Sequence, residues 1–223
     1  METKFISSEA IRFGWEKMKK HFWFFVGLLI LTWLIQVVPS GIANVFKDKM
    51  VVLYILLIVL AWVLQVIVKM GMIKITLDIV DKDKAEIKTL FSQVDLFLKF
   101  LFGSVLYGLI VMAGLILLIV PGIIWAIKYQ FFVYLIIDKN LSPMEAIKKS
   151  GEITMGSKGK LFWLGLLLGL INIAGVICLL IGLFVTIPVT MVAMVYVYRK
   201  LMGELSVVQP VTAPLPSVTE PQA

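Results

Sequence analysis

The stretch that decides the fold covers residues 96–137 and reads LFLKFLFGSVLYGLIVMAGLILLIVPGIIWAIKYQFFVYLII, with only two charged residues, Lys99 and Lys128. A helix needs about 20 predominantly apolar residues to cross the hydrocarbon core of a bilayer, so this stretch is long enough to cross twice. Pro121 and Gly122 stand in its middle as a turn signal. We therefore predict a helical hairpin that turns at Pro121-Gly122.

Similar stretches lie on both sides of this hairpin. Residues 22–42 and 51–72 are each of crossing length, and residues 161–198 carry no charge and are long enough to fold back between Gly175 and Gly182. The chain is 61% hydrophobic and 16% charged, with a mean hydropathy of +1.01, which is unlike a soluble domain. The predicted fold class is all-α: over residues 1–203, a polytopic membrane protein with six transmembrane helices as three hairpins. Residues 204–223 are proline-rich and are predicted to be a disordered cytoplasmic tail.

The distribution of basic residues predicts the orientation. All but three of the 21 Lys and Arg residues flank the two ends of the six-helix region or the connections that follow residues 72 and 137. Basic residues are retained on the cytoplasmic side, so both termini are predicted to be cytoplasmic. The net charge of +7 then indicates the anionic lipids of the inner leaflet as partners, because no recognition motif indicates nucleic acid.

A weak internal repeat links two of the hairpins. Residues 108–116 (GLIVMAGLI) match residues 169–177 (GLINIAGVI), and chance similarity among Gly- and Leu-rich sequences is the alternative. A helix-like segment precedes each hairpin, at residues 8–19, 86–94 and 142–155. We expect these segments to be amphipathic helices that lie in the cytoplasmic interface, apolar side to the acyl chains. The candidate residues for contact with lipid headgroups are Arg12, Lys19, Lys20, Lys148 and Lys149.

The sequence lacks the usual constellations of catalytic residues. It has one histidine, His21, and one cysteine, Cys178, and no acidic residue falls inside a predicted span. Zinc sites, paired aspartates and phosphate-binding loops are therefore missing, and we expect no enzyme activity, cofactor or metal. Four acidic residues in the second cytoplasmic connection are interleaved with lysines and are interpreted as a solvated connector rather than a metal site: Asp78, Asp81, Asp83 and Glu86.

Lys128 falls deep inside a predicted span, where a charge costs about 3 kcal/mol and suggests a function, whereas Lys69 and Lys99 flank the second cytoplasmic connection. Tyr129 and Gln130 follow Lys128, and Gln36 and Asn172 fall at a similar depth in the outer half. Lys128 and these four side chains are predicted as a candidate ligand-binding site for an anion. The alternative is that the Lys128 side chain extends to the outer lipid headgroups, while the side-chain amides of the other residues make hydrogen bonds between helices.

Four segments carry a resemblance to a known family: VPGII at residues 120–124 leading to Lys128-Tyr129, SPMEAIKKS at residues 142–150, GLFVTIP at residues 182–188, and Tyr198-Arg199. Together they resemble the YciC-like family of uncharacterised six-span prokaryotic membrane proteins, which is related to the membrane domain of some glycerophosphodiester phosphodiesterases. The resemblance covers about the last half of the chain. It implies a prokaryotic cytoplasmic membrane and no established activity.

Two functions follow as hypotheses. The first is a non-enzymatic membrane protein that contacts anionic lipids or organises a membrane partner. The second is a transporter, channel or lipid-translocating protein with an anion site at Lys128. The sequence leaves open whether the partner is a second copy of the chain or another membrane protein.

Overall fold

The computed structural model describes residues 5–46, 50–178 and 181–205, and all regular structure in these residues is helical. Six helical segments are long and apolar enough to cross a membrane. The fold class is thus confirmed as an all-α, multi-pass membrane protein. The predicted tail lies outside the described residues from position 206 on.

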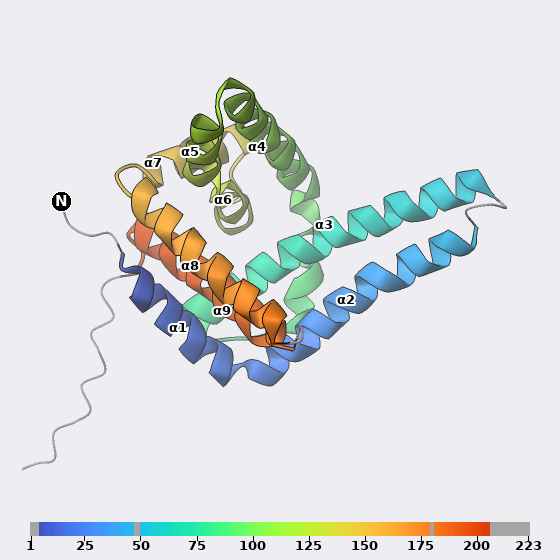
Figure 1. Ribbon diagram of the computed structural model, residues 1–223. Coiled ribbons are helices and arrows are strands. Elements are labelled where there is room, and N and C mark those ends of the chain that lie inside the picture. The colour runs from blue at the N-terminus through green and yellow to red at the C-terminus, as the bar shows by residue number, and fades with distance from the viewer. Residues whose placement is uncertain (1–4, 47–49, 179–180, 206–223) are drawn as a thin grey trace, which may run out of the picture.

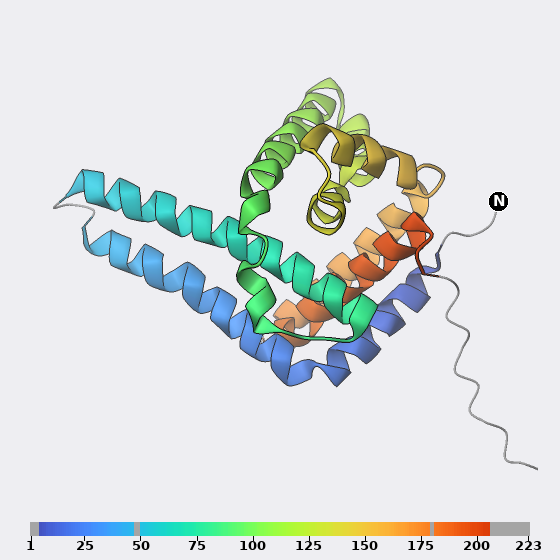
Figure 2. The ribbon, with the colours of Figure 1, turned by 180° about the vertical axis from the view of Figure 1, so that it is seen from behind.

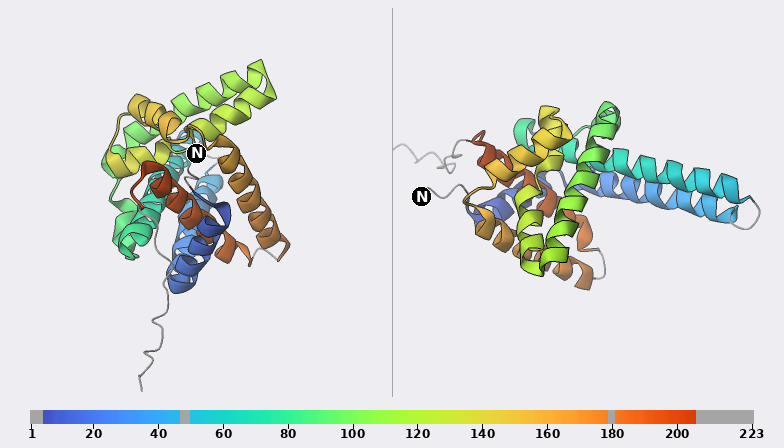
Figure 3. Two further views of the ribbon diagram at one scale, coloured as in Figure 1. Left: turned by 90° about the vertical axis from the view of Figure 1, so that its left-hand side faces the viewer. Right: turned by 90° about the horizontal axis from the view of Figure 1, so that it is seen from above.

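The six segments form three hairpins (Figures 1 and 2). The first joins α2 (Phe22–Val45) to α3 (Val51–Lys82), and its turn projects away from the other helices, as the right-hand view of Figure 3 also shows. The second joins α4 (Phe97–Leu117) to α5 (Ile119–Tyr129) and α6 (Phe132–Lys139). The third joins α8 (Lys158–Ile177) to α9 (Leu183–Met202). The predicted turn after Gly175 is therefore confirmed.

The turn of the second hairpin lies earlier than predicted. The chain reverses at Leu118, which has an extended backbone, whereas Pro121 lies in the first turn of α5. Proline is tolerated there because the first turn of a helix leaves its N–H groups without intrahelical partners. The prediction of a turn at Pro121-Gly122 was therefore wrong by about three residues.

The internal repeat has a structural counterpart in how the two hairpins close. A Cβ atom added to Gly114 would lie 2.9 Å from the Cα of Gly122, and one added to Gly182 would lie 2.7 Å from the Cα of Gly175. Gly114 and Gly175 are equivalent positions of the repeat. Both hairpins thus close through a contact between two glycines, where a side chain would force the helices apart.

Two helices differ in length from the prediction. The fourth span breaks at Gln130 and Phe131, between α5 and α6. The second span continues as α3 to Lys82, so Asp78 and Asp81 belong to a helix and not to a connector.

The segments predicted as interfacial helices have a different environment from the one expected. The first is α1 (Ser7–Lys20), which buries Ala10, Gly14 and Met18 and packs along α9. The third is α7 (Pro143–Ile153), which buries Ile147 among α4, α5 and α6. These buried residues therefore face protein, while Trp15 of α1 and Met144 of α7 stay exposed. The middle segment forms two short 3-10 helices, η1 (Ile87–Phe91) and η2 (Val94–Leu96), and no α-helix.

Helix α7 begins at Pro143, one residue after the start of its predicted segment. Ser142 and Glu145 form a capping box in which each side chain accepts a hydrogen bond from the other's backbone N–H. Hydrogen bonds from the Ser142 side chain and backbone lower the pKa of Glu145.

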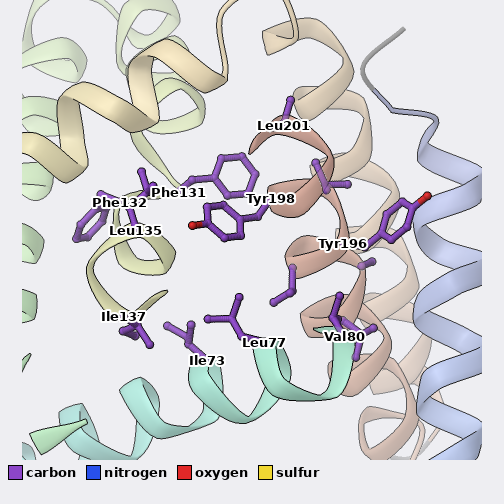
Figure 4. Close-up of a cluster of buried hydrophobic side chains, with 14 of the residues drawn as sticks. Ile73, Leu77, Val80, Phe131, Phe132, Leu135, Ile137, Tyr196, Tyr198 and Leu201 are labelled. Carbon is purple, nitrogen blue, oxygen red and sulfur yellow. The ribbon is translucent and has the colours of Figure 1, made fainter. Parts of the chain in front are cut away.

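The core lies where α9 meets the second half of α3 and α6 (Figure 4). Tyr196 and Tyr198 leave α9 on opposite sides, Tyr196 toward α1 and Tyr198 toward α6. The Tyr198 ring stacks on Tyr134 at 5.4 Å between centroids. Because α9 is covered on both sides, it is the central helix of the fold.

Candidate functional site

The predicted site around Lys128 does not assemble. The Lys128 ammonium donates to the Tyr129 hydroxyl at 2.9 Å and lies 4.7 Å from the centre of the Tyr129 ring. A Cβ atom on Gly151 of α7 would lie 3.1 Å from the Lys128 Cε atom, so the lysine stem packs against α7. The Lys128 carbonyl also accepts hydrogen bonds from Ser150 at 3.1 Å and Thr154 at 2.9 Å.

The other residues predicted for that site lie in different parts of the structure. Asn172 donates to Thr190 at 3.0 Å, which joins α8 to α9. Gln36 is exposed on α2 and lines a groove beside α3. Gln130 lines a cavity at the break between α5 and α6. Asn172 and Gln36 therefore have other neighbours than Lys128, whose span is broken at Gln130 and packs against α7.

A cavity of about 520 Å³ lies between α3, α4, α6 and α9, and we name it the central cavity. Its wall is mostly apolar, with Met72, Phe132 and Met194 among the lining residues, and Gln130, Ser104 and Lys69 supply polar groups. A second hollow of about 290 Å³, the side groove, lies between α2 and α3 and contains Gln36, Gln65 and Lys69. Lys69 and Met72 line both hollows.

A third hollow of about 660 Å³ lies where α1 meets α2, and we name it the N-terminal hollow. Lys19 and Lys20 line it together with Trp15 and Trp23, and the Trp23 side chain is 82% exposed. The Lys19 ammonium lies 5.9 Å from the centre of the Trp15 ring. Two predicted headgroup contacts are thus brought together with exposed indoles at the start of a candidate span, and tryptophan favours the membrane interface.

The remaining predicted headgroup contacts lie on exposed surfaces. Arg12 pairs with Glu16 at 3.0 Å, and Lys149 pairs with Glu152 at 3.2 Å. Lys148 is exposed on α7. These contacts leave the basic side chains accessible.

Three of the four acidic residues, Asp78, Asp81 and Asp83, pair with basic side chains, so the prediction of a solvated connector was wrong for these three. Asp83 ends α3 in the left-handed conformation, and its carboxylate binds Lys17 at 2.8 Å, Lys20, and His21 at 3.1 Å. These hydrogen bonds hold the pKa of Asp83 well below its usual range. The junction of α1 and α2 is therefore fixed to the end of α3.

Arg199, near the end of α9, is the buried cation that sequence reasoning missed. Its guanidinium makes two hydrogen bonds to Asp81 of α3, at 2.9 and 2.6 Å, and two to Asp138 of α6, at 2.6 and 2.7 Å. It also binds Glu204 at 2.5 Å, and Tyr198 donates to Asp138 at 2.9 Å. We name Arg199, Asp81, Asp138 and Glu204 the Arg199 junction. Within the described ranges, no group of three or more His, Cys, Asp or Glu side chains has metal-binding geometry.

The fold and these hollows define the class of this chain: a multi-pass α-helical membrane protein with hollows between its helices. It is 34% identical over 136 residues to the uncharacterized protein Mb2590 of Mycobacterium bovis, and 33% identical to the uncharacterized protein Rv2560 of Mycobacterium tuberculosis. The match covers 60% of this chain but only 41% of each relative. No family model and no solved structure matches the chain, so the resemblance to YciC-like proteins stays a prediction.

Proposed function

We propose that this protein is a non-enzymatic protein of a prokaryotic cytoplasmic membrane, with both ends in the cytoplasm, that binds anionic lipids along a basic rim. The rim consists of the five predicted headgroup contacts: Arg12, Lys19, Lys20, Lys148 and Lys149. The mycobacterial relatives support a prokaryotic membrane.

The N-terminal hollow is the observation that carries this proposal. Lys19 offers an ammonium group to a lipid phosphate, while the exposed Trp23 offers an amphipathic ring suited to the depth of the headgroups. Each basic residue near an anionic surface contributes about 1 kcal/mol of attraction. Lys20 also binds Asp83, so Lys19 is the rim residue of this hollow that is available to a lipid.

The contacts between helix ends support the orientation. The end of α3, the end of α6 and the end of α9 meet in the Arg199 junction, and the end of α3 also holds the junction of α1 and α2 through Asp83. All four regions are the ones that the distribution of basic residues assigns to the cytoplasm. A chain that crosses the membrane six times requires all four of these regions to lie on the same side.

The alternative of an anion transporter centred on Lys128 has less support. The Lys128 ammonium is bound by Tyr129, its stem is covered by α7, and neither Gln36 nor Asn172 reaches it.

The test is the lipid composition around the full-length protein. We expect the double variant Lys19→Gln/Lys148→Gln, in nanodiscs of equal phosphatidylglycerol and phosphatidylcholine, to release less phosphatidylglycerol with the protein in native mass spectrometry. The expected loss of enrichment is about fivefold for each lysine, from about 1 kcal/mol each. The control Lys84→Gln/Lys88→Gln removes the same charge from the connection after α3 and from η1. Equal enrichment in the two double variants would contradict the proposal.

A further inference from the structure

Lys69 is the lysine of α3 that has no acidic partner in the part of the chain that the structure describes. Lys74 and Lys82, on the same helix, both pair with Asp78, at 3.4 and 3.2 Å. Lys69 is exposed, and no ion pair or side-chain hydrogen bond joins it to the described residues. Its ammonium is therefore free to bind an external anion.

The position of Lys69 along α3 matches the depth of lipid headgroups. Residues 51–68 of α3 carry no charge, and 18 residues of helix rise by about 27 Å. The hydrocarbon core of a bilayer is about 30 Å thick, so an upright α3 that enters it at Val51 carries its first charged residue at the opposite boundary. A phosphate in the adjacent leaflet lies at this level.

Two hollows meet at this lysine. The central cavity lies on one side of α3 and the side groove on the other, with volumes of about 520 and 290 Å³. Lys69 and Met72 belong to both walls, so a molecule with its charge at Lys69 can place one apolar part in each hollow. The larger hollow falls in the usual size range of ligand sites.

The polar groups beside Lys69 suit the ester groups that link the phosphate end of a phospholipid to its acyl chains. On α3, Gln65 lies one helical turn from Lys69, and Gln36 of α2 faces the same groove. In the central cavity, the Ser104 hydroxyl has no hydrogen-bond partner among the described residues, and the Gln130 amide nitrogen binds the Ile127 carbonyl at 3.1 Å. These side chains offer donors for ester carbonyl groups.

We propose that the two hollows hold one anionic diacyl phospholipid, with its phosphate on Lys69 and one acyl chain in each hollow. This site is separate from the basic rim, and it rests on the proposed function only in requiring a membrane that contains anionic lipid. The free lysine selects the anionic headgroup, and the two hollows select two chains.

The test uses the full-length protein, delipidated in detergent and titrated with dioleoyl phosphatidylglycerol in native mass spectrometry. We expect one lipid to be retained, and Lys69→Gln to weaken its binding by about tenfold or more. Lys69→Arg keeps the charge and should retain the lipid. The control Lys74→Gln removes one charge from the same helix outside both hollows and should leave binding unchanged.

Further measurements separate the source of the anion and the role of the hollows. Ser104→Phe fills the central cavity without changing charge and should weaken binding, as should the single-chain lysophosphatidylglycerol. Displacement of the lipid by equimolar inorganic phosphate would overturn the proposal in favour of a free-anion site. Equal retention of phosphatidylcholine, or unchanged binding in Lys69→Gln, would also overturn it.

The two proposals can fail separately. Loss of phosphatidylglycerol enrichment in the rim variant, together with an unchanged bound lipid in Lys69→Gln, would remove this inference and keep the proposed function. The reverse pattern would keep the internal site and remove the rim.

Discussion

Replacing Arg199 by methionine should destabilise the protein more than removing any exposed arginine. The Arg199 side chain is 6% exposed and holds three carboxylates, of which Asp138 is 10% exposed and the most buried. Without the guanidinium, Asp138 is left as a buried charge whose nearest cation is its neighbour Lys139, at 3.4 Å. Breaking one side of a buried ion pair costs about 3–5 kcal/mol.

The assay is unfolding of the purified protein in mixed micelles, followed by tryptophan fluorescence. In a chain of this length, a loss of about 3–5 kcal/mol corresponds to a fall in Tm of roughly 6–20 °C. Arg12→Met is the matched control: Arg12 is 81% exposed, and its pair with Glu16 should contribute about 0–1 kcal/mol. Adding Asp138→Asn to Arg199→Met should restore part of the loss. If Arg199→Met cost no more than Arg12→Met, the buried junction would be refuted.

Two further outcomes concern stability. Gly71→Ala should cost about 3 kcal/mol, because a Cβ atom there would collide with the backbone of η1, 2.6 Å from the Cα of Leu90. In the control Gly165→Ala the new methyl group meets open space and should change stability by less than about 0.5 kcal/mol. Equal Tm values for the two variants would contradict the contact between Gly71 and η1. Asp83→Asn should lower stability at pH 7, because a carboxylate with a lowered pKa contributes stability above its unfolded pKa of about 3.9 and loses it as the pH falls through the folded value. The difference between wild type and Asp83→Asn should therefore shrink below about pH 4 in pH-dependent unfolding, and a constant difference would oppose the assignment.

The fold class could be predicted from the sequence because membrane crossing is a property of local composition. The uncharged stretches and the glycine turn after Gly175 each determine a hairpin without knowledge of the rest of the chain. The turn at Leu118 was missed because Pro121 serves equally well inside the first turn of a helix.

The candidate site depended on pairings between distant segments, which composition does not encode. Asp81 and Asp138 are joined by Arg199 across 118 and 61 residues, and no local pattern marks which acid meets which base. Lys69 had a local signal, since Gln65 precedes it by one helical turn on the same face of α3. That signal was overlooked because Lys69 was counted as the flank of a span.

The contact between α1 and α9 constrains how the chain is assembled in the membrane. Glu9 and Tyr196 bond across 187 residues, so α1 leaves the ribosome well before α9, the helix on which it packs. At about 5–20 residues per second, synthesis leaves a delay of roughly 10–40 s between them. During that time the small-residue face of α1, centred on Gly14, is without its final partner, and the lipid surface is the nearest substitute. We therefore expect an insertion intermediate in which α1 stays unpacked until α9 has been made.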